Sequence, residues 1–157
     1  MLTMEQLGGS SDKPQYEMLL VEGSDASIHR DDVERLLDGK VIHAPVLYSL
    51  DQALELVEKS KMQLWMIRAV GEDRPCLFML TEILQYPAGK TVNICLVAGS
   101  RLLPAAKQLF TLFLMWTMKR DVDYIECVAK PSIMRVLVKM GFTPTGVRLH
   151  YPLRRMQ

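Results

Sequence analysis

The segment from Ala98 to Ala106 is the part of this sequence best suited to binding chemistry. An apolar, strand-like run ends at Ala98, and a long apolar run that predicts a helix begins at Leu103. The connection between them is short and contains small and polar residues (Gly99, Ser100 and Arg101). Free backbone N–H groups at a helix start, together with the helix dipole, bind phosphate groups. We therefore interpret this junction as a candidate phosphate-binding loop.

The three cysteines do not form a recognisable metal-binding or disulfide pattern. Cys76, Cys95 and Cys127 each fall inside an apolar run of the kind that forms strands. An odd number of cysteines in such positions indicates buried free thiols in a reducing compartment, rather than a disulfide framework or a reactive thiol. Their spacing fits no zinc-ligand motif, so we predict no metal site.

Length and composition indicate a single globular domain. The chain has 157 residues, of which 49% are hydrophobic and 24% are charged, as is typical of one domain with a sizeable core. The net charge of +1 gives no electrostatic basis for binding nucleic acids or acidic membranes. The most apolar segment, Leu109–Met118, is much shorter than the roughly twenty residues that a membrane span needs. Because the N-terminal segment is polar, we expect no signal peptide and a cytoplasmic location.

Apolar periodicity and turn residues predict alternating helices and strands. One early helix begins at Asp31 and ends before Gly39, and another begins at Ser49, which has capping-box spacing with Gln52. The predicted strands are 16–21 (a strand or an arm), 62–70, 76–83, 91–98, 123–129 and 146–153, and the later helices are 103–120 and 131–140. This order predicts an α+β (mixed α/β) domain with a sheet flanked by helices.

The predicted helix 103–118 is apolar around nearly its whole circumference. A helix of this kind is usually buried on most sides. We expect it to lie between the sheet and another element, and a subunit contact is the alternative.

The order of these elements resembles that of the GCN5-related N-acetyltransferase family, from about Ile28 to Leu153. The best local match is the segment 134–142, MRVLVKMGF, which resembles the family's penultimate helix and its K-x-Gly-Phe ending. There the glycine forms a left-handed C-terminal cap and the phenylalanine packs back onto the helix. The resemblance implies a central mixed, mostly antiparallel sheet. It divides the chain into an N-terminal arm or first strand, 1–27, and a single acetyltransferase-like domain, 28–157.

The resemblance also gives the candidate phosphate-binding loop a specific ligand. In the family, a Gln/Arg-x-x-Gly-x-Gly/Ala motif at the start of the central helix holds the pyrophosphate of acetyl-CoA through backbone N–H groups. The nearest match begins at Arg101, and Pro104 replaces its first glycine. Proline suits the first turn of a helix but has no N–H, and losing one hydrogen bond to a charged group costs about 1.5–3 kcal/mol. The candidate cofactor-binding residues implied by the resemblance are Ala98, Gly99, Ser100, Arg101, Ala105, Ala106 and Lys130.

The catalytic positions of the family are also changed in this sequence. Leu137 stands where a tyrosine often protonates the CoA thiolate, and Lys130 stands where an asparagine often contacts cofactor or product. The predicted central strand, 91–98, has no acid or histidine to act as a general base. Glu82 on the preceding strand and Glu126 on the following strand are the candidate catalytic substitutes, each acting through a water. The alternative for each is a solvated carboxylate at a strand edge.

Two functions follow from the resemblance, and the sequence favours the first. In the first, the acetyltransferase-like fold has a decayed acyl-CoA site, binds no cofactor and is a structural or interaction component of a larger assembly. Internal virion proteins of short-tailed bacteriophages include small proteins of this kind, which the chain resembles in size and element order. This function implies a protein partner or a homo-oligomer, in the host cytoplasm or the virion. In the alternative, the chain is an active acetyl-CoA-dependent N-acetyltransferase.

Overall fold

The computed structural model describes residues 2–3, 13–38, 41–43 and 49–147. The strands are β1 (Leu2–Thr3), β2 (Tyr16–Leu20), β3 (Val41–His43), β4 (Gln63–Ala69), β5 (Leu77–Tyr86), β6 (Gly89–Gly99) and β7 (Tyr124–Cys127). The helices are the 3₁₀ helix η2 (Gly23–His29) and the α-helices α1 (Arg30–Leu37), α2 (Leu50–Glu58), α3 (Leu102–Met118) and α4 (Pro131–Lys139).

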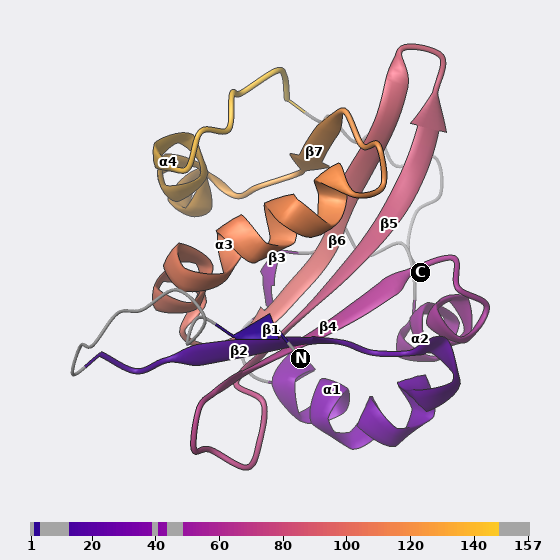
Figure 1. Cartoon of the computed structure of the whole chain (residues 1–157), viewed down its shortest axis with the longest axis vertical. Coiled ribbons are helices and arrows are strands. Elements are labelled where there is room, and N and C mark those ends of the chain that lie inside the picture. Colours follow the sequence, from indigo (N-terminus) through magenta and orange to yellow (C-terminus); the bar gives the residue numbers. More distant parts are fainter. Residues whose placement is uncertain (1, 4–12, 39–40, 44–48, 148–157) are drawn as a thin grey trace, which may run out of the picture.

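The described strands form one sheet with helices on both faces (Figure 1). The strand order is β1-β2-β4-β5-β6-β3, and β7 pairs with β6 as well. Only β6 and β7 run parallel, and the other described pairs are antiparallel. The predicted fold class, a mixed and mostly antiparallel sheet flanked by helices, is therefore confirmed.

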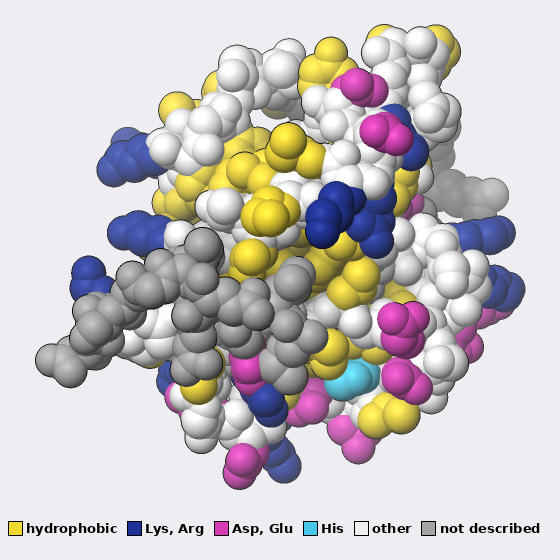
Figure 2. Space-filling view, viewed as in Figure 1, with side chains coloured by type: hydrophobic (Ala, Val, Ile, Leu, Met, Phe, Trp, Pro, Cys, Tyr) yellow, Lys and Arg dark blue, Asp and Glu magenta, His cyan; other side chains and the backbone are white. Residues whose placement is uncertain are grey.

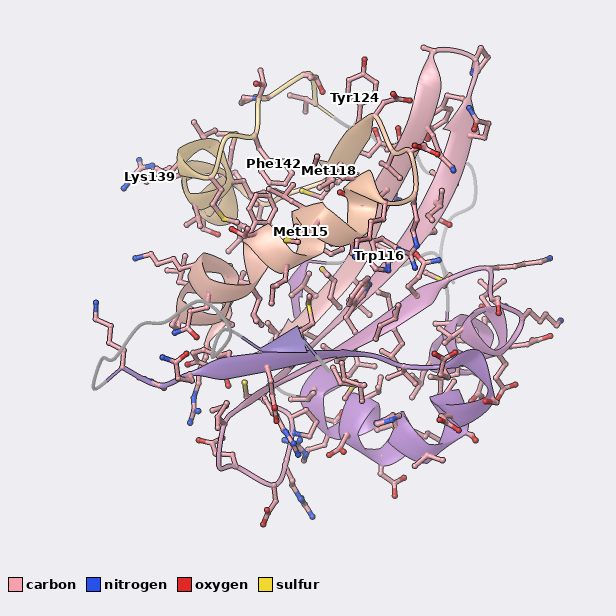
Figure 3. All side chains as sticks on the ribbon, viewed as in Figure 1. Met115, Trp116, Met118, Tyr124, Lys139 and Phe142 are labelled. Atoms are coloured by element: carbon pink, nitrogen blue, oxygen red, sulfur yellow. The ribbon has the colours of Figure 1, made fainter. Side chains whose placement is uncertain are left out.

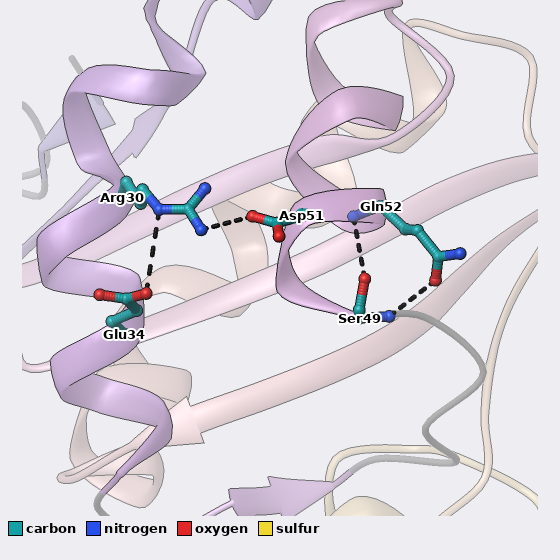
Figure 4. A network of polar contacts seen from close by, with 5 residues as sticks. All are labelled: Arg30, Glu34, Ser49, Asp51 and Gln52. Carbon is teal, nitrogen blue, oxygen red and sulfur yellow. Dashed lines mark hydrogen bonds and ion pairs between the residues drawn. The ribbon is translucent and has the colours of Figure 1, made fainter.

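Helices α1 and α2 cover one face of the sheet. They bury an apolar stripe each (Val33 and Leu36 from α1; Ala53, Leu54 and Val57 from α2) against side chains of β4 and β5. The predicted capping box of α2 is present, because Gln52 N–H donates to Ser49 Oγ at 3.2 Å and Ser49 N–H donates to Gln52 Oε1 at 2.9 Å (Figure 4). Arg30 of α1 pairs with Asp51 of α2 and ties the two helices together (Figure 4).

Helix α3 packs on the opposite face of the sheet. Its buried side chains include Leu109, Phe113 and Trp116, and the ring of Trp65 on β4 meets the last two edge-on, with centroids 5.4 and 4.7 Å away. The outer side of α3 stays exposed, with Met118 at 73%. The expectation that this helix is buried on most sides is thus wrong for the described residues, since only the sheet-facing side is fully covered.

Helix α4 ends as predicted but is packed more loosely than the other helices. The N–H groups of Gly141 and Phe142 donate to the carbonyls of Val138 and Leu137, each at 3.0 Å, and Gly141 has φ +103°. This is the Schellman pattern of a helix that ends in glycine. The ring of Phe142 contacts Phe110 of α3, with centroids 5.9 Å apart. No residue of α4 is buried, although the helix is amphipathic.

The boundaries of several elements differ from the predictions. Strand β5 extends to Tyr86 because it forms a long hairpin with β6 around Pro87 and Ala88, and the 3₁₀ helix η2 and strand β3 were not predicted from the sequence. Residues 146 and 147 are not in a strand, and the rest of the predicted strand 146–153 lies outside the described residues, as does Gly39. The domain boundary at residue 28 stays a prediction.

Candidate functional site

The loop between β6 and α3 is held against the start of β5. Ser100 N–H donates to the carbonyl of Cys76 at 2.8 Å, and the Ser100 hydroxyl lies 3.4 Å from the same oxygen. Gly99 has φ +125°, and a Cβ atom there would lie 2.3 Å from the Cys76 carbonyl oxygen. Glycine is required at this position because two backbone segments approach closely. The Ser100 amide therefore makes its hydrogen bond within the protein.

Arg101 is also paired within the protein. Its guanidinium donates to a carboxylate oxygen of Glu72, in the β4–β5 connection, at 2.7 Å. This hydrogen bond and the charge of Glu72 raise the pKa of Arg101. Both side chains are exposed, so the pair is expected to add little stability. The pair places the Glu72 carboxylate next to Arg101, the cation predicted to bind a phosphate.

The remaining residues of the predicted cofactor loop serve packing. Ala98 and Ala105 are buried, at 0% and 1% exposure, and Ala105 N–H donates to the Arg101 carbonyl at 3.1 Å. Ala106 lines an apolar cavity beneath α3. Pro104 lies in the first turn of α3, where the missing N–H costs the helix nothing. Lys130, the last of the predicted cofactor-binding residues, differs from these: it is exposed and is the N-cap residue of α4.

Strand β3 covers the edge of β6 just before this loop. The partner of β6 is β7 from Thr91 to Ile94 and then β3 at Val97 and Ala98. A ligand that lies along this part of the central strand would have to share the edge with β3. A pyrophosphate group at this loop would find the Ser100 amide bonded to Cys76, no N–H at Pro104, and Arg101 paired with Glu72.

The two candidate catalytic glutamates lie in one row across three strands. Glu82 on β5 is the register partner of Asn93 on β6, which is in turn the partner of Glu126 on β7. Register partners point to the same face of a sheet, and Asn93 Nδ2 donates to Glu82 Oε1 at 3.0 Å. The hydroxyl of Tyr86 lies 3.3 Å from Glu126 Oε1. We call Glu82, Asn93 and Glu126 the carboxylate row. It offers two oriented acceptors for a proton from a bound amine.

Cys95 lies beside the carboxylate row. Burial, followed by the charge of Glu82 and a hydrogen bond to it, raises the pKa of the Cys95 thiol to about 12. Burial is also the main reason why the pKa values of Cys76 and Cys127 are raised. The three thiols are free and are expected to be protonated at neutral pH. Only Cys76 is buried, so the predicted burial is wrong for Cys95 and Cys127, which are half-buried.

Asn93 was missed by the sequence analysis, although the hairpin turn contains the signal that identifies it. Tyr86 pairs with Gly89 across the two-residue turn. Counting outward from that pair places Glu82 opposite Asn93. The register with β7 has no such local signal, because a parallel strand arrives after a long helix.

Neither a metal cluster nor a membrane-spanning helix is found in the described residues. No group of three or more His, Cys, Asp or Glu side chains in the described ranges could hold a metal ion. Within the same ranges, no helix is long and apolar enough to cross a membrane.

Solved structures with the same architecture include several acetyltransferases. A predicted acetyltransferase from Clostridium acetobutylicum, solved with acetyl-CoA, shares 16% identity, covers 88% of this chain and 96% of its own, and has a TM-score of 0.62. An aminoglycoside N-acetyltransferase in complex with CoA shares 16% identity over 93% of this chain and 99% of its own, with a TM-score of 0.62. Glucosamine-6-phosphate N-acetyltransferase from Arabidopsis thaliana shares 11% identity over 88% of this chain and 99% of its own, with a TM-score of 0.61.

These similarities define the class of fold. The chain has the fold of the GCN5-related N-acetyltransferases, as its element order predicted. No protein-family model matches the sequence, and no curated protein matches it. At this level of identity the likeness concerns the fold, and function has to be argued from the site.

Proposed function

We propose that this protein is an acetyltransferase fold that does not use its acyl-CoA site and instead acts as an interaction component of a larger assembly. The proposal rests on the loop that would hold pyrophosphate, whose hydrogen-bond donors are either used within the protein or missing. There the Ser100 N–H donates to Cys76, Pro104 has no N–H, and Arg101 is paired with Glu72. Loss of two donors and neutralisation of one cation each weaken the binding of a charged ligand.

An exposed apolar surface on the outer side of α3 supports the interaction role. Figure 2 shows hydrophobic side chains gathered on the face that carries α3 and α4. Met115 and Met118 are one turn apart on α3 and are 51% and 73% exposed, and Tyr124 on β7 is 62% exposed (Figure 3). Methionine-rich apolar surfaces adapt to protein partners. The partner is either another protein, for example in a phage virion, or a second copy of the chain.

Titration of acetyl-CoA into the purified protein tests the cofactor part of the proposal. We expect no binding at millimolar acetyl-CoA, whereas a micromolar dissociation constant would overturn the proposal. The variants Pro104→Gly and Glu72→Gln return an amide and a free guanidinium to the loop. Each is expected to improve acetyl-CoA affinity by roughly ten- to a hundredfold at most.

Light scattering during size-exclusion chromatography tests the interaction part. We expect self-association, or partner-dependent assembly, that Met118→Glu weakens. Ile28→Glu is the matched control, because Ile28 is 74% exposed on η2 and lies outside the α3 surface. If Ile28→Glu weakens assembly as much as Met118→Glu does, the α3 surface is not the contact.

A second candidate function is N-acetyl transfer, and the carboxylate row is the observation that favours it. Solved structures of this fold contain acetyl-CoA or CoA, and Glu82 or Glu126 could accept the proton of an attacking amine through a water. Glu82→Gln and Glu126→Gln should each reduce such an activity and leave the fold intact. If wild type shows no turnover of acetyl-CoA with any of several amines, this candidate is removed.

A further inference from the structure

The two helical layers of the protein carry charges of opposite sign. Helices α1 and α2 together have six acidic residues and two arginines, a net charge of −4. Helices α3 and α4 have three cations and no acidic residue, a net charge of +3. We call the first pair the acidic layer and the second pair the basic layer. Because they lie on opposite faces of one sheet (Figure 1), the chain is polarised across its sheet although its net charge is only +1.

Many of these charges have no ionic partner within the part of the chain that the structure describes. The three cations of α3 and α4 are exposed and make no ion pair there, and neither do Lys119 and Lys130 at the helix ends. In the acidic layer, the ion pairs leave Asp31, Asp38 and Glu58 exposed and unpaired among the described residues. Each layer therefore presents free charges of one sign to solvent.

The basic layer also exposes apolar side chains. Besides Met115 and Met118 of α3, Met134 and Val138 of α4 are 43% and 46% exposed. Figure 2 shows Lys and Arg side chains next to the hydrophobic side chains of this face, while Asp and Glu side chains gather in the lower half of the view, where α1 and α2 lie. An apolar centre with a polar rim is typical of protein–protein contacts.

The two layers also match in width. The ion pair between Arg30 and Asp51 joins α1 to α2, and the ring of Phe142, just after α4, contacts Phe110 of α3. Each layer is therefore two helices wide, which is about 20 Å. One copy cannot bring its own layers together, because the sheet lies between them. Two copies can.

We propose that the basic layer of one copy docks on the acidic layer of a second copy, head to tail. The inference rests on the interaction role proposed above and names its partner. A contact between two different surfaces leaves one free layer at each end of a pair, so copies are added until a ring closes or a filament forms. A two-fold symmetric dimer would instead place like charges opposite one another, which is unfavourable.

Sedimentation velocity of the full chain at rising concentration tests the proposal. We expect the mass to increase past that of a dimer. Raising the salt concentration from about 0.1 M to 1 M shortens the Debye length from about 10 Å to 3 Å and should weaken the association at least about tenfold. A monomer at every concentration, a mass that stops at the dimer, or an association that salt leaves unchanged would each overturn the proposal.

Two variants with neutralised charges locate the two surfaces. The basic-neutral variant carries Lys107→Gln, Arg135→Gln and Lys139→Gln, and the acid-neutral variant carries Asp31→Asn, Asp38→Asn and Glu58→Gln. Each variant alone should associate about tenfold more weakly than wild type, because one of its two surfaces has lost three charges. All six side chains are exposed and make no ion pair among the described residues, so the fold should be kept, which circular dichroism checks.

An equimolar mixture of the two variants gives the sharpest result. The intact basic layer of one variant can dock on the intact acidic layer of the other, and no intact layer is then left over. We therefore expect the mixture to recover the wild-type affinity in a dimer that does not grow. Wild-type association of either variant alone, or a mixture that associates no better than its components, would overturn the proposal.

Arg74→Gln is the matched control. It removes an exposed cation from the β4–β5 connection, outside both layers, and should leave the association unchanged. If it weakens association as much as the basic-neutral variant does, the position of the cation is irrelevant and the proposal fails. The proposal also fails if the chain stays monomeric and binds vesicles of phosphatidylserine and phosphatidylcholine, because the basic layer would then dock on an anionic membrane.

Titration of acetyl-CoA keeps this inference separate from the proposed function. A chain that neither self-associates nor binds acetyl-CoA would exclude a second copy as the partner and leave another protein in that role. Micromolar binding of acetyl-CoA would overturn the proposed function, whether or not the chain self-associates.

Discussion

The two helical layers of this protein cover the same sheet but are packed to different degrees. On one face, α1 and α2 bury complete apolar stripes and are joined by the Arg30–Asp51 ion pair. On the other face, α3 is buried only toward the sheet, α4 has no buried residue, and an apolar cavity lies between them. The first layer is a closed structural support. The second keeps apolar surface and space for a ligand or a partner.

The difference indicates where sequence change affects the fold and where it affects function. The closed layer contains the capping box and most of the ion pairs that fix its helices. Of the residues predicted to bind the cofactor, Ala105, Ala106 and Lys130 belong to the open layer or its edge, whereas Ala98 packs toward α1 and α2. In the loop between β6 and α3, Ser100 and Arg101 make contacts within the protein, whereas the neighbouring cavity is lined by apolar side chains.

The largest expected difference between the two helical layers is in the alkylation rates of Cys95 and Cys127. Because the Cys95 pKa is raised to about 12, its thiolate fraction at pH 8 is roughly a thousandfold below that of an unperturbed cysteine. We expect native Cys95 to alkylate slowly, with a rate that increases with pH up to about 12. Cys127, whose side chain lines the cavity, should react faster because α4 can move. Mass spectrometry after timed iodoacetamide treatment measures both rates, and equal rates would mean that the two layers open alike.

Two leucine-to-alanine variants test packing directly. Leu54 on α2 is buried and Leu137 on α4 is half-buried. Leu54→Ala should cost about 2–5 kcal/mol of the free energy of unfolding, and Leu137→Ala only about 1 kcal/mol. Urea denaturation gives both values. A cost for Leu137→Ala as large as that for Leu54→Ala would show that α4 is part of the core.

Two glycine-to-alanine variants separate close approach from backbone strain. At Gly99 a Cβ atom would lie 2.3 Å from the Cys76 carbonyl oxygen, whereas at Gly141 no atom lies within 4 Å of it. Both glycines have positive φ, so Gly141→Ala should cost about 1 kcal/mol through strain alone. Gly99→Ala should cost about 2–3 kcal/mol because the backbone of β5 must also move. Equal melting temperatures would mean that the loop is not held against Cys76.

The smallest expected changes in stability are those at the first residues of α2 and α4. Ser49 caps α2 through its side chain, but Lys130 at the start of α4 makes no side-chain capping bond. Ser49→Ala should lower the free energy of unfolding by about 1 kcal/mol. Lys130→Asp should raise it by about 0.5–1 kcal/mol, because a carboxylate favours a helix N-terminus. Denaturation midpoints measure both changes, and a destabilised Lys130→Asp would show that Lys130 has another partner.

Local signals were sufficient to predict most of the elements. The pair Ser49 and Gln52 predicted the start of α2, and Gly141 with Phe142 predicted the end of α4, because each motif satisfies the backbone groups of its own helix end. Strand β3 and the 3₁₀ helix were not predicted. A three-residue strand has almost no periodicity, so its place depends on the free edge of β6 rather than on its own sequence.

The candidate site was predictable only in part. Pro104 showed directly that one amide was missing, because that effect belongs to a single residue. The bond from Ser100 to Cys76 and the pair between Arg101 and Glu72 join residues from distant parts of the chain. Side-chain types do not specify such contacts before the sheet register is known. The carboxylate row has the same origin, except for the Glu82–Asn93 pair that the hairpin turn determines.

Hydrogen exchange with and without millimolar acetyl-CoA is the sharpest test of whether the loop between β6 and α3 binds the cofactor. We expect α1 and α2 to exchange slowly, α4 to exchange faster, and acetyl-CoA to change no peptide that includes residues 98–106. Protection of that loop by acetyl-CoA would overturn the proposed function, because it would show that Ser100 and its neighbours bind the cofactor.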